Sequence, residues 1–403
     1  MNRRVVITGV GAVSPLGIGA DTLIDRWTAG ESGISGGLGA CREFEPLEHL
    51  TKKEARRSDR FTQMAVVSAD EALELSGFGT GEDEELPYPS ERIGCIIGTG
   101  IGGIGSLQEQ DAVLRERGPK AVSPLAVPLM MGNAASAAVA MRFGLKGETY
   151  GVMSACAAGA HAIGSATRLI ESGRADAAVA GGAESAMIGI ALAAFASMGA
   201  TSPTGISRPF DARRDGFVMG EGAGILVLEE AEAAEARGAE VIGEITGYAA
   251  TCDASHLTAP DPAGTQSARA ISTAIEEAGL EPGDLDYINA HGTSTTLNDS
   301  SETRALKVAL GSDAYGIPIS STKSVIGHLM GAGGAVEAVA TILTLKQGIA
   351  PPTVGLEEPD EELDLDYIPG EARPLTAKNE RLTAISNSFG FGGHNAVLCF
   401  RGA

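Results

Sequence analysis

The feature that most constrains the fold is a run of very small residues that follows a single cysteine within residues 151–170. From Cys156 onward, nearly every side of a helix would be small or apolar until Arg168, which indicates a helix buried all round. Inside a helix, Gly159 and Gly164 each cost about 1 kcal/mol relative to alanine, so we expect another part of the chain to approach the backbone closely at both. A thiol in the first turn of such a helix lies near unpaired N–H groups and the positive end of the helix dipole, which favour the thiolate. Cys156 is therefore a candidate nucleophile, although a buried structural cysteine is the commoner role for a cysteine considered alone.

Strand-like and helix-like segments alternate along the chain, which predicts an α/β fold with helices on both faces of a sheet. In the first part we expect a strand beginning at residue 4 and strands at 92–98 and 176–183. Residues 208–228 form a polar loop that leads into a further strand, and helices are expected at 61–76, near 132–143 and at 229–240. From about residue 241 the pattern begins again, with strands at 241–248, 285–290, 317–321, 382–386 and 395–400, and helices at 265–279 and 333–347. The strand, polar turn and small-residue helix around Cys156 recur around His328. We therefore interpret the chain as two similar halves, residues 1–240 and 241–403.

Charge and composition narrow the possible partners. The net charge of −22 would repel nucleic acid and anionic membrane surfaces, so we expect neither as a partner. No segment has about 18 uninterrupted apolar residues, and the start of the chain lacks the apolar length of a signal peptide. Five scattered cysteines without Cys-x-x-Cys spacing indicate a reducing compartment. We expect a cytoplasmic protein.

A glycine turn near the start of the chain superficially matches a dinucleotide-binding loop. Gly9 and Gly11 would be its first two glycines, but Ser14 occupies the third position. Pro15 follows where a phosphate-binding helix would continue. We therefore reject a dinucleotide cofactor.

Three polar side chains occupy turns where α/β folds place their active sites. They are Cys156, His291 in Asn-Ala-His-Gly-Thr-Ser-Thr, and His328 in Lys-Ser-Val-Ile-Gly-His. A zinc site of one cysteine and two histidines is conceivable. None of the three lies at short spacing from another, however, so we expect no metal.

Five segments, in order along the chain, resemble motifs of the β-ketoacyl-acyl carrier protein synthases. They are Ser154-Ala-Cys-Ala-Ala-Gly, the Arg208-Pro-Phe-Asp and Arg-Asp-Gly-Phe-Val-Met-Gly-Glu-Gly-Ala-Gly stretch, Asn289-Ala-His-Gly-Thr-Ser-Thr, Ser321-Thr-Lys-Ser-Val-Ile-Gly-His, and Asn387-Ser-Phe-Gly-Phe-Gly-Gly. The likeness extends from Val5 to Phe400 and is closest to the elongating type II condensing enzymes of fatty acid synthesis. It implies the thiolase fold, with two duplicated halves, mixed central sheets and five layers in the order α-β-α-β-α. It also implies a homodimer.

The resemblance implies catalytic roles at five positions and a supporting role at a sixth, Glu302. Cys156 would accept the acyl group, and His291 and His328 would complete a Cys-His-His triad. Lys323 would lie beside the second histidine, with Glu302 as its partner. Phe391 would gate the site, and its backbone N–H would join that of Cys156 in an oxyanion hole.

The resemblance also implies substrate contacts. Thr293 and Thr295 would hold a pantetheine arm, Ile101 would line the acyl pocket, and Phe389 would contact substrate. The substrates would arrive on the phosphopantetheine of acyl carrier protein, and the enzyme would need no cofactor of its own.

Docking of the carrier protein is less sharply indicated. Relatives often carry an arginine for docking where this chain has Gly199. The better candidates are basic residues elsewhere: Lys52, Lys53, Arg56, Arg57 and Lys120. On charge pattern alone, the first four are equally consistent with a solvated helix face.

The implied reaction is the decarboxylative Claisen condensation of malonyl-acyl carrier protein with an acyl group held on Cys156, as in a 3-oxoacyl-[acyl-carrier-protein] synthase. The residue chemistry agrees, because two imidazole N–H groups could stabilise the enolate that decarboxylation creates. The alternatives are a type II polyketide ketosynthase and a non-catalytic chain-length partner. Such partners typically lack the nucleophile, which is present here. A thiolase is disfavoured because residues 389–394 contain no second cysteine.

Overall fold

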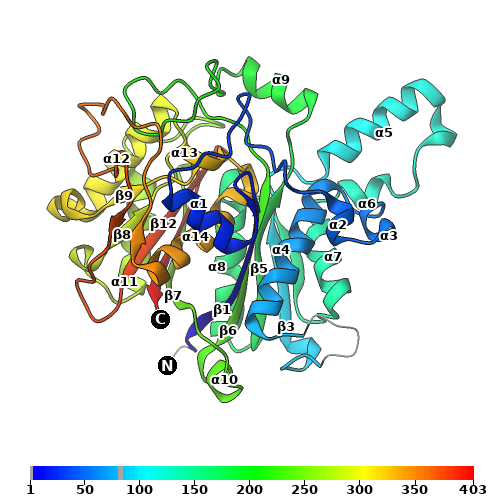
Figure 1. The fold of residues 1–403 in the computed structure, drawn as a ribbon, viewed down its shortest axis with the longest axis horizontal. Coiled ribbons are helices and arrows are strands. Elements are labelled where there is room, and N and C mark those ends of the chain that lie inside the picture. The colour runs from blue at the N-terminus through cyan, green and yellow to red at the C-terminus, as the bar shows by residue number, and fades with distance from the viewer. Residues whose placement is uncertain (1–2, 80–84) are drawn as a thin grey trace.

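The computed structural model describes residues 3–79 and 85–403. Its main sheet follows the strand order β4-β3-β5-β6-β1-β7-β13-β12-β8-β9, with β2 paired to β1 (Figure 1). The strands are β1 (Val5–Ser14), β2 (Gly17–Ile18), β3 (Ile93–Gly98), β4 (Thr149–Val152), β5 (Ala177–Glu184), β6 (Gly222–Glu230), β7 (Gly243–Cys252), β8 (Tyr287–Asn289), β9 (Ile319–Ser320), β10 (Ile349–Ala350), β11 (Arg373–Pro374), β12 (Thr383–Gly390) and β13 (His394–Gly402). Strands β10 and β11 form a separate small sheet.

The two ends of this strand order mirror one another. In the first half, β3 is parallel to β4 and β5, whereas β6 is antiparallel to β5 and β1. In the second half, β8 is parallel to β9 and β12, whereas β13 is antiparallel to β12 and β7. An antiparallel pairing of β1 with β7 joins the two arms. These are the mixed sheets of two similar halves that the sequence predicts.

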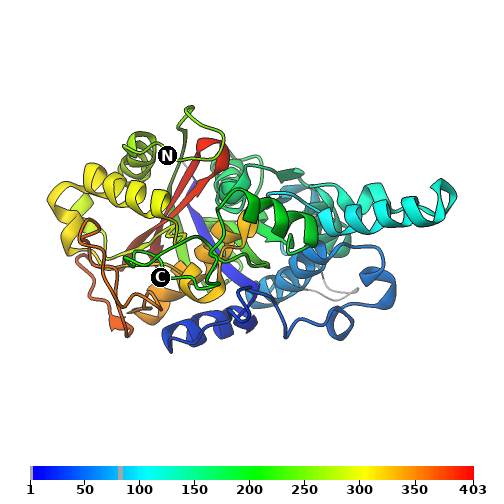
Figure 2. The ribbon, with the colours of Figure 1, turned by 90° about the horizontal axis from the view of Figure 1, so that it is seen from above.

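Helices cover both arms and fill the space between them. The helices are α1 (Ala20–Thr28), α2 (Pro46–His49), α3 (Lys52–Ala55), α4 (Arg60–Ser76), α5 (Ile104–Arg117), α6 (Ala126–Met130), α7 (Ala134–Phe143), α8 (Ala158–Glu171), α9 (Gly189–Ser197), α10 (Ala231–Ala236), α11 (Thr265–Glu277), α12 (Thr296–Leu310), α13 (Lys323–Ile326) and α14 (Gly333–Gln347). Helices α8 and α14 pack on each other and on both arms, α4 and α7 cover the first arm, and α11 covers the second with α12 against it (Figure 1). The result is the five-layered order α-β-α-β-α. Figure 2 shows α5 projecting from this body.

The central helices approach closely because their contact positions lack side chains. A Cβ placed on Gly159 would lie 2.8 Å from the backbone nitrogen of Ala335, and one on Gly334 would lie 3.1 Å from that of Ala160. A Cβ on Gly164 would lie 2.3 Å from the ring of Tyr248. The expected close approach at Gly159 and Gly164 is thus confirmed.

The prediction of a helix from residue 229 is wrong at its start. Strand β6 continues to Glu230, and α10 begins only at Ala231. Charged residues usually indicate an exposed helix face, but the Glu229 side chain is completely buried, where it accepts hydrogen bonds from Tyr88 (2.6 Å) and from Arg237 Nε (2.6 Å). Because its charge is paired, the Glu229 carboxylate can lie buried near the end of β6.

No helix in the described part of the chain is long and apolar enough to cross a membrane.

Candidate active site

A pocket of about 460 Å³ opens where the two halves meet. Its lining includes Cys156 from the first half and both His291 and His328 from the second. The structure therefore brings together the three polar turns that the sequence places far apart.

Cys156 lies in a single 3-10 turn, Ala155–Ala157, directly before α8. Its Sγ is 3.1 Å from Nε2 of His328. Burial raises the pKa of the Cys156 thiol to about 11, although a backbone hydrogen bond from Phe391 and the positive charge of Lys323 act in the opposite direction. The expectation that the helix start favours a thiolate is not met, because the effect of burial outweighs the groups that lower the pKa of this thiol. The sulfur needs a proton acceptor, and His328 is placed to be one.

The two histidines meet edge to face, with ring centroids 5.4 Å apart and an interplanar angle of 86°. The His328 backbone is held on both sides, since its N–H donates to the Val218 carbonyl (2.7 Å) and its carbonyl accepts from the N–H of Gly220 (2.9 Å). Burial lowers the pKa of both imidazoles well below the usual value, and the charge of Lys323 adds to this effect. Both rings are therefore neutral at physiological pH. The Nδ1 atom of each ring has no hydrogen-bond partner among the described residues.

The expected pairing of Lys323 with Glu302 is wrong. Lys323 forms its ion pair with Glu337 of α14, and both side chains are only 1% exposed. Glu302 instead accepts the backbone N–H groups of His291 and Gly292, at 2.8 Å each. Burial raises the pKa of Glu302 to about 7, although these two N–H groups act against the rise. Glu302 thus fixes the strand end that carries His291, and Lys323 lies behind the histidines, outside the pocket lining.

Phe391 lies beside the nucleophile in the short turn Phe391–Gly393 between β12 and β13. A Cβ on Gly390 would lie 3.1 Å from the backbone nitrogen of Cys156, so the two backbones nearly touch. The Phe391 ring packs against Phe195 of α9, with centroids 6.4 Å apart. Beyond it, the N–H of Gly392 donates to the Leu257 carbonyl (2.8 Å). The turn is therefore held to a second loop at the pocket wall.

The four expected substrate-binding residues all line the pocket. The hydroxyl oxygens of Thr293 and Thr295 are 2.9 Å apart. The Phe389 ring lies 5.9 Å from the ring of His291, and Ile101 lies across the pocket in the loop after β3. The structure thus places all four in the pocket that Cys156 also lines.

The five basic docking candidates lie outside the pocket lining. Lys52 and Lys53 belong to α3, Arg56 and Arg57 follow it, and Lys120 lies in the turn after α5. All five are exposed, and none forms an ion pair within residues 3–79 and 85–403. Figure 1 shows α3 beside α2, on the opposite side of the molecule from α12.

Sequence reasoning missed two buried carboxylates. Glu337 is the single charged residue of the buried stretch 333–345. A lone charge in an otherwise uncharged stretch could have indicated a buried ion pair. Glu184 accepts hydrogen bonds from the backbone N–H groups of Ile101 (3.3 Å) and Gly331 (3.2 Å), and so joins loops from both halves. Burial raises the pKa of Glu184 to about 7, with the N–H donors of Gly100 and Gly331 working against it.

The described residues contain no group of three or more His, Cys, Asp or Glu side chains that could hold a metal ion. A buried thiol beside a neutral imidazole, with a second imidazole opposite, is the arrangement of a thiol-dependent acyltransferase. The chain belongs to the beta-ketoacyl synthase family. It matches the N-terminal domain of that family over residues 42–234 and the C-terminal domain over residues 242–357. The expected family, fold and class of condensing enzyme are confirmed.

Relatives of known name cover almost the whole chain. A 3-oxoacyl-[acyl-carrier-protein] synthase 2 from Synechocystis sp. is 47% identical over 99% of this chain and 98% of its own. One from Staphylococcus aureus is 42% identical with the same coverage. A solved beta-ketoacyl synthase from Burkholderia phymatum is 36% identical, with a TM-score of 0.90 over the whole of both chains. A type II polyketide ketosynthase, solved with its acyl-carrier protein and bound to a hexaketide, is 32% identical with the same TM-score and coverage.

Proposed function

We propose that this chain is an elongating 3-oxoacyl-[acyl-carrier-protein] synthase, which lengthens an acyl chain by two carbons at the expense of a malonyl unit. The observation that carries the proposal is the 3.1 Å contact of Cys156 Sγ with His328 Nε2 at the bottom of a pocket that His291 also lines. The names of the relatives at 42–47% identity support the same reaction.

In the first step, Cys156 takes the acyl group from a carrier. The thiol proton passes to Nε2 of His328 as sulfur attacks the thioester carbonyl, and the imidazolium then protonates the departing pantetheine sulfur. The backbone N–H groups of Cys156 and Phe391 are the donors for the carbonyl oxygen. His328 is available to accept this proton because burial and the charge of Lys323 lower its pKa and keep the ring neutral.

In the second step, a malonyl thioester loses CO₂. The electrons of the broken C–C bond move onto the thioester, and the developing enolate oxygen receives N–H hydrogen bonds from His291 and His328. His328 must now carry its proton on Nε2, whereas in the first step Nε2 accepts. The unpartnered Nδ1 allows this change of tautomer, since no neighbouring group fixes the proton there.

In the third step, the enolate carbon attacks the acyl carbonyl on Cys156. The C–S bond breaks, the cysteine leaves as a thiolate that is then protonated, and a 3-ketoacyl chain remains on the incoming carrier. This step depends on placing the two carbons at contact distance more than on acid–base strength.

We also propose the partners and location that the family implies. Five exposed basic side chains (Lys52, Lys53, Arg56, Arg57 and Lys120) would dock an acidic acyl carrier protein. Two chains would pair through β4, an edge strand that has β3 as its one neighbour among residues 3–79 and 85–403 and leaves Tyr150 and nearby Met153 exposed. Five free cysteines support a reducing, cytoplasmic location.

A polyketide ketosynthase remains the second candidate, because the structural match to one has a TM-score of 0.90. The higher identity to the 3-oxoacyl synthases favours fatty acid elongation. Products separate the two: a fatty acid enzyme makes one condensation with each saturated acyl primer, whereas a polyketide enzyme repeats the step without reduction.

Intact-mass analysis after incubation with acyl carrier proteins of varied acyl length tests the proposal. We expect a mass increase on the wild-type protein, none on Cys156→Ala, and a 3-ketoacyl product only after malonyl carrier is added to the wild type. CO₂ release should persist in Cys156→Ala, because decarboxylation uses the histidines. Acylation of Cys156→Ala would overturn the assignment of the nucleophile.

A further inference from the structure

Residues 208–216 contribute no catalytic side chain to the proposed mechanism. They nevertheless surround one residue of the loop that carries His291, Thr293 and Thr295. That residue is Ser294, which lies between Thr293 and Thr295 and is completely buried. The N–H of Arg208 donates to the Ser294 hydroxyl oxygen (3.0 Å), and the N–H of Gly216 donates to its carbonyl (3.0 Å). The segment therefore holds Ser294 by its side chain and by its backbone.

Ser294 has a left-handed backbone, with φ of +68°. A residue other than glycine keeps this conformation only where its surroundings hold it there. In an extended strand, side chains two residues apart lie about 7 Å from each other. Here the hydroxyl oxygens of Thr293 and Thr295 are 2.9 Å apart, because the chain turns at Ser294.

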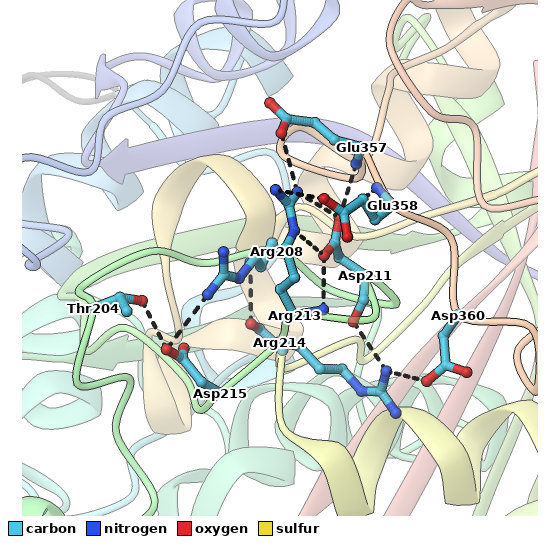
Figure 3. Close-up of polar contacts among 10 residues, drawn as sticks. Thr204, Arg208, Asp211, Arg213, Arg214, Asp215, Glu357, Glu358 and Asp360 are labelled. Carbon is cyan, nitrogen blue, oxygen red and sulfur yellow. Dashed lines mark hydrogen bonds and ion pairs between the residues drawn. The ribbon is translucent and has the colours of Figure 1, made fainter.

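The segment that holds Ser294 is itself anchored on both sides. Asp211 is completely buried and accepts the backbone N–H groups of Glu357 (2.9 Å) and Glu358 (2.8 Å) together with the Arg213 guanidinium (Figure 3). Arg214 reaches Asp360 at 2.6 Å. These contacts tie the middle of the segment to the loop around residues 357–360.

The ends of the segment are fixed at the pocket wall. Asp215 lines the pocket, accepts from the Thr204 hydroxyl (2.8 Å) and meets the Arg208 guanidinium (Figure 3). The N–H of Phe210 donates to one oxygen of Asp299 and the N–H of Thr293 to the other, at 3.0 Å each. Residues 208–216 thus hold the loop at two adjacent residues, at Thr293 through Asp299 and at Ser294 directly.

We infer that Ser294 is a positioning residue that sets the spacing of the Thr293 and Thr295 hydroxyls, and that residues 208–216 hold it in its left-handed conformation. The inference rests on the proposed role of the two threonines in binding the pantetheine arm of the substrate. A pair of hydroxyls in contact offers one compact acceptor and donor site for the amide groups of such an arm.

The test compares a donor that carries the arm with a reagent that does not. Ser294→Ala removes the acceptor of the Arg208 N–H, and so loosens the hold on the residue that spaces the Thr293 and Thr295 hydroxyls. We expect KM for hexanoyl-pantetheine, measured by acylation of Cys156, to rise about tenfold. The rate of Cys156 alkylation by iodoacetamide should stay within about twofold of wild type, because that reaction uses no threonine contact.

Two further variants sharpen the comparison. Ser294→Gly also loses the hydroxyl but adopts positive φ readily, so its KM should lie between those of wild type and Ser294→Ala. Ser68→Ala removes an equally buried hydroxyl from α4, outside the pocket, and should leave KM unchanged.

An unchanged KM in Ser294→Ala would overturn the inference. So would a fall in iodoacetamide reactivity by the same factor as the change in KM, since that would mean a general distortion of the site. If Ser294→Ala does not fold, Ser294→Gly decides the question, and a wild-type KM there overturns the inference. Failure of the proposed function looks different, because wild-type protein would then not be acylated by hexanoyl-pantetheine at all.

Discussion

Lys323 and Glu337 form an ion pair that is sealed from solvent, one from the turn that carries His328 and the other from the central helix α14. The pair holds the positive charge of Lys323 near the two catalytic imidazoles, although Lys323 itself does not line the pocket. Its effect on the site is electrostatic, since the charge of Lys323 lowers the pKa of His291, His328 and Cys156 alike.

Removing only one partner of this ion pair should destabilise the folded protein. Lys323→Met leaves the Glu337 carboxylate buried without a partner, and we expect the free energy of unfolding to fall by about 3–5 kcal/mol. The double variant Lys323→Met with Glu337→Gln removes both charges and should recover most of that loss. Urea denaturation of the three proteins measures the difference. Equal stability of single and double variants would show that the carboxylate is not charged in the folded protein.

The same double variant should change the pH dependence of acylation. A nearby positive charge disfavours an imidazolium, so removing Lys323 raises the pKa of both histidines toward the ordinary value of about 6.5. Burial remains, so the rise is partial. As the pH falls through this raised pKa, which burial still keeps below about 6.5, protonated His328 can no longer accept the thiol proton. Acylation should therefore begin to decline at a higher pH in the variant than in the wild type. Intact-mass rates between pH 5 and pH 8 test this, and a wild-type midpoint near pH 6.5 would contradict it.

His328→Ala should separate two steps of the reaction. Without its proton acceptor, the Cys156 thiol with a pKa of about 11 is almost fully protonated at pH 7. Acylation should therefore fall at neutral pH and recover about tenfold for each unit of added pH, because the thiolate fraction grows by that factor. Decarboxylation should not recover, since hydroxide does not replace an N–H donor at the enolate oxygen. Parallel pH profiles for acylation and CO₂ release would refute this division.

Gly390→Ala should slow catalysis by crowding the oxyanion hole. Its φ of −117° suits any residue, so the effect comes from space alone: the new methyl would lie 3.1 Å from the backbone nitrogens of Cys156 and Ala157. Displacing the Cys156 N–H, one of the two oxyanion-hole donors, should lower kcat by about tenfold to hundredfold. Gly316→Ala is the matched control, because nothing lies within 4 Å of its Cβ position. Equal kcat in the two variants would show that the turn moves freely.

The sequence predicts the parts of this site that depend on local pattern. Cys156, His291 and His328 stand at turns between buried segments, and such turns are recognisable from glycine and alanine spacing. The partner of Lys323 was not predictable in this way, because Glu302 and Glu337 are both carboxylates buried within helices. Only the packing of α14 decides which one reaches the lysine. The direction of the pKa shift of Cys156 could not be predicted from the sequence either, since it depends on how completely the two halves exclude water from the thiol.

The contact of α8 with α14 has a consequence for exchanging parts between relatives. Cys156 precedes one helix and His328 precedes the other, so the distance from sulfur to imidazole is a distance between halves. Gly159 and Gly334 set how closely the two helices approach. A chimera that takes its first half from one enzyme and its second from another inherits two unmatched helix faces. Such a hybrid can fold correctly in each half and still hold the sulfur too far from its proton acceptor, so helices α8 and α14 should be exchanged as one unit.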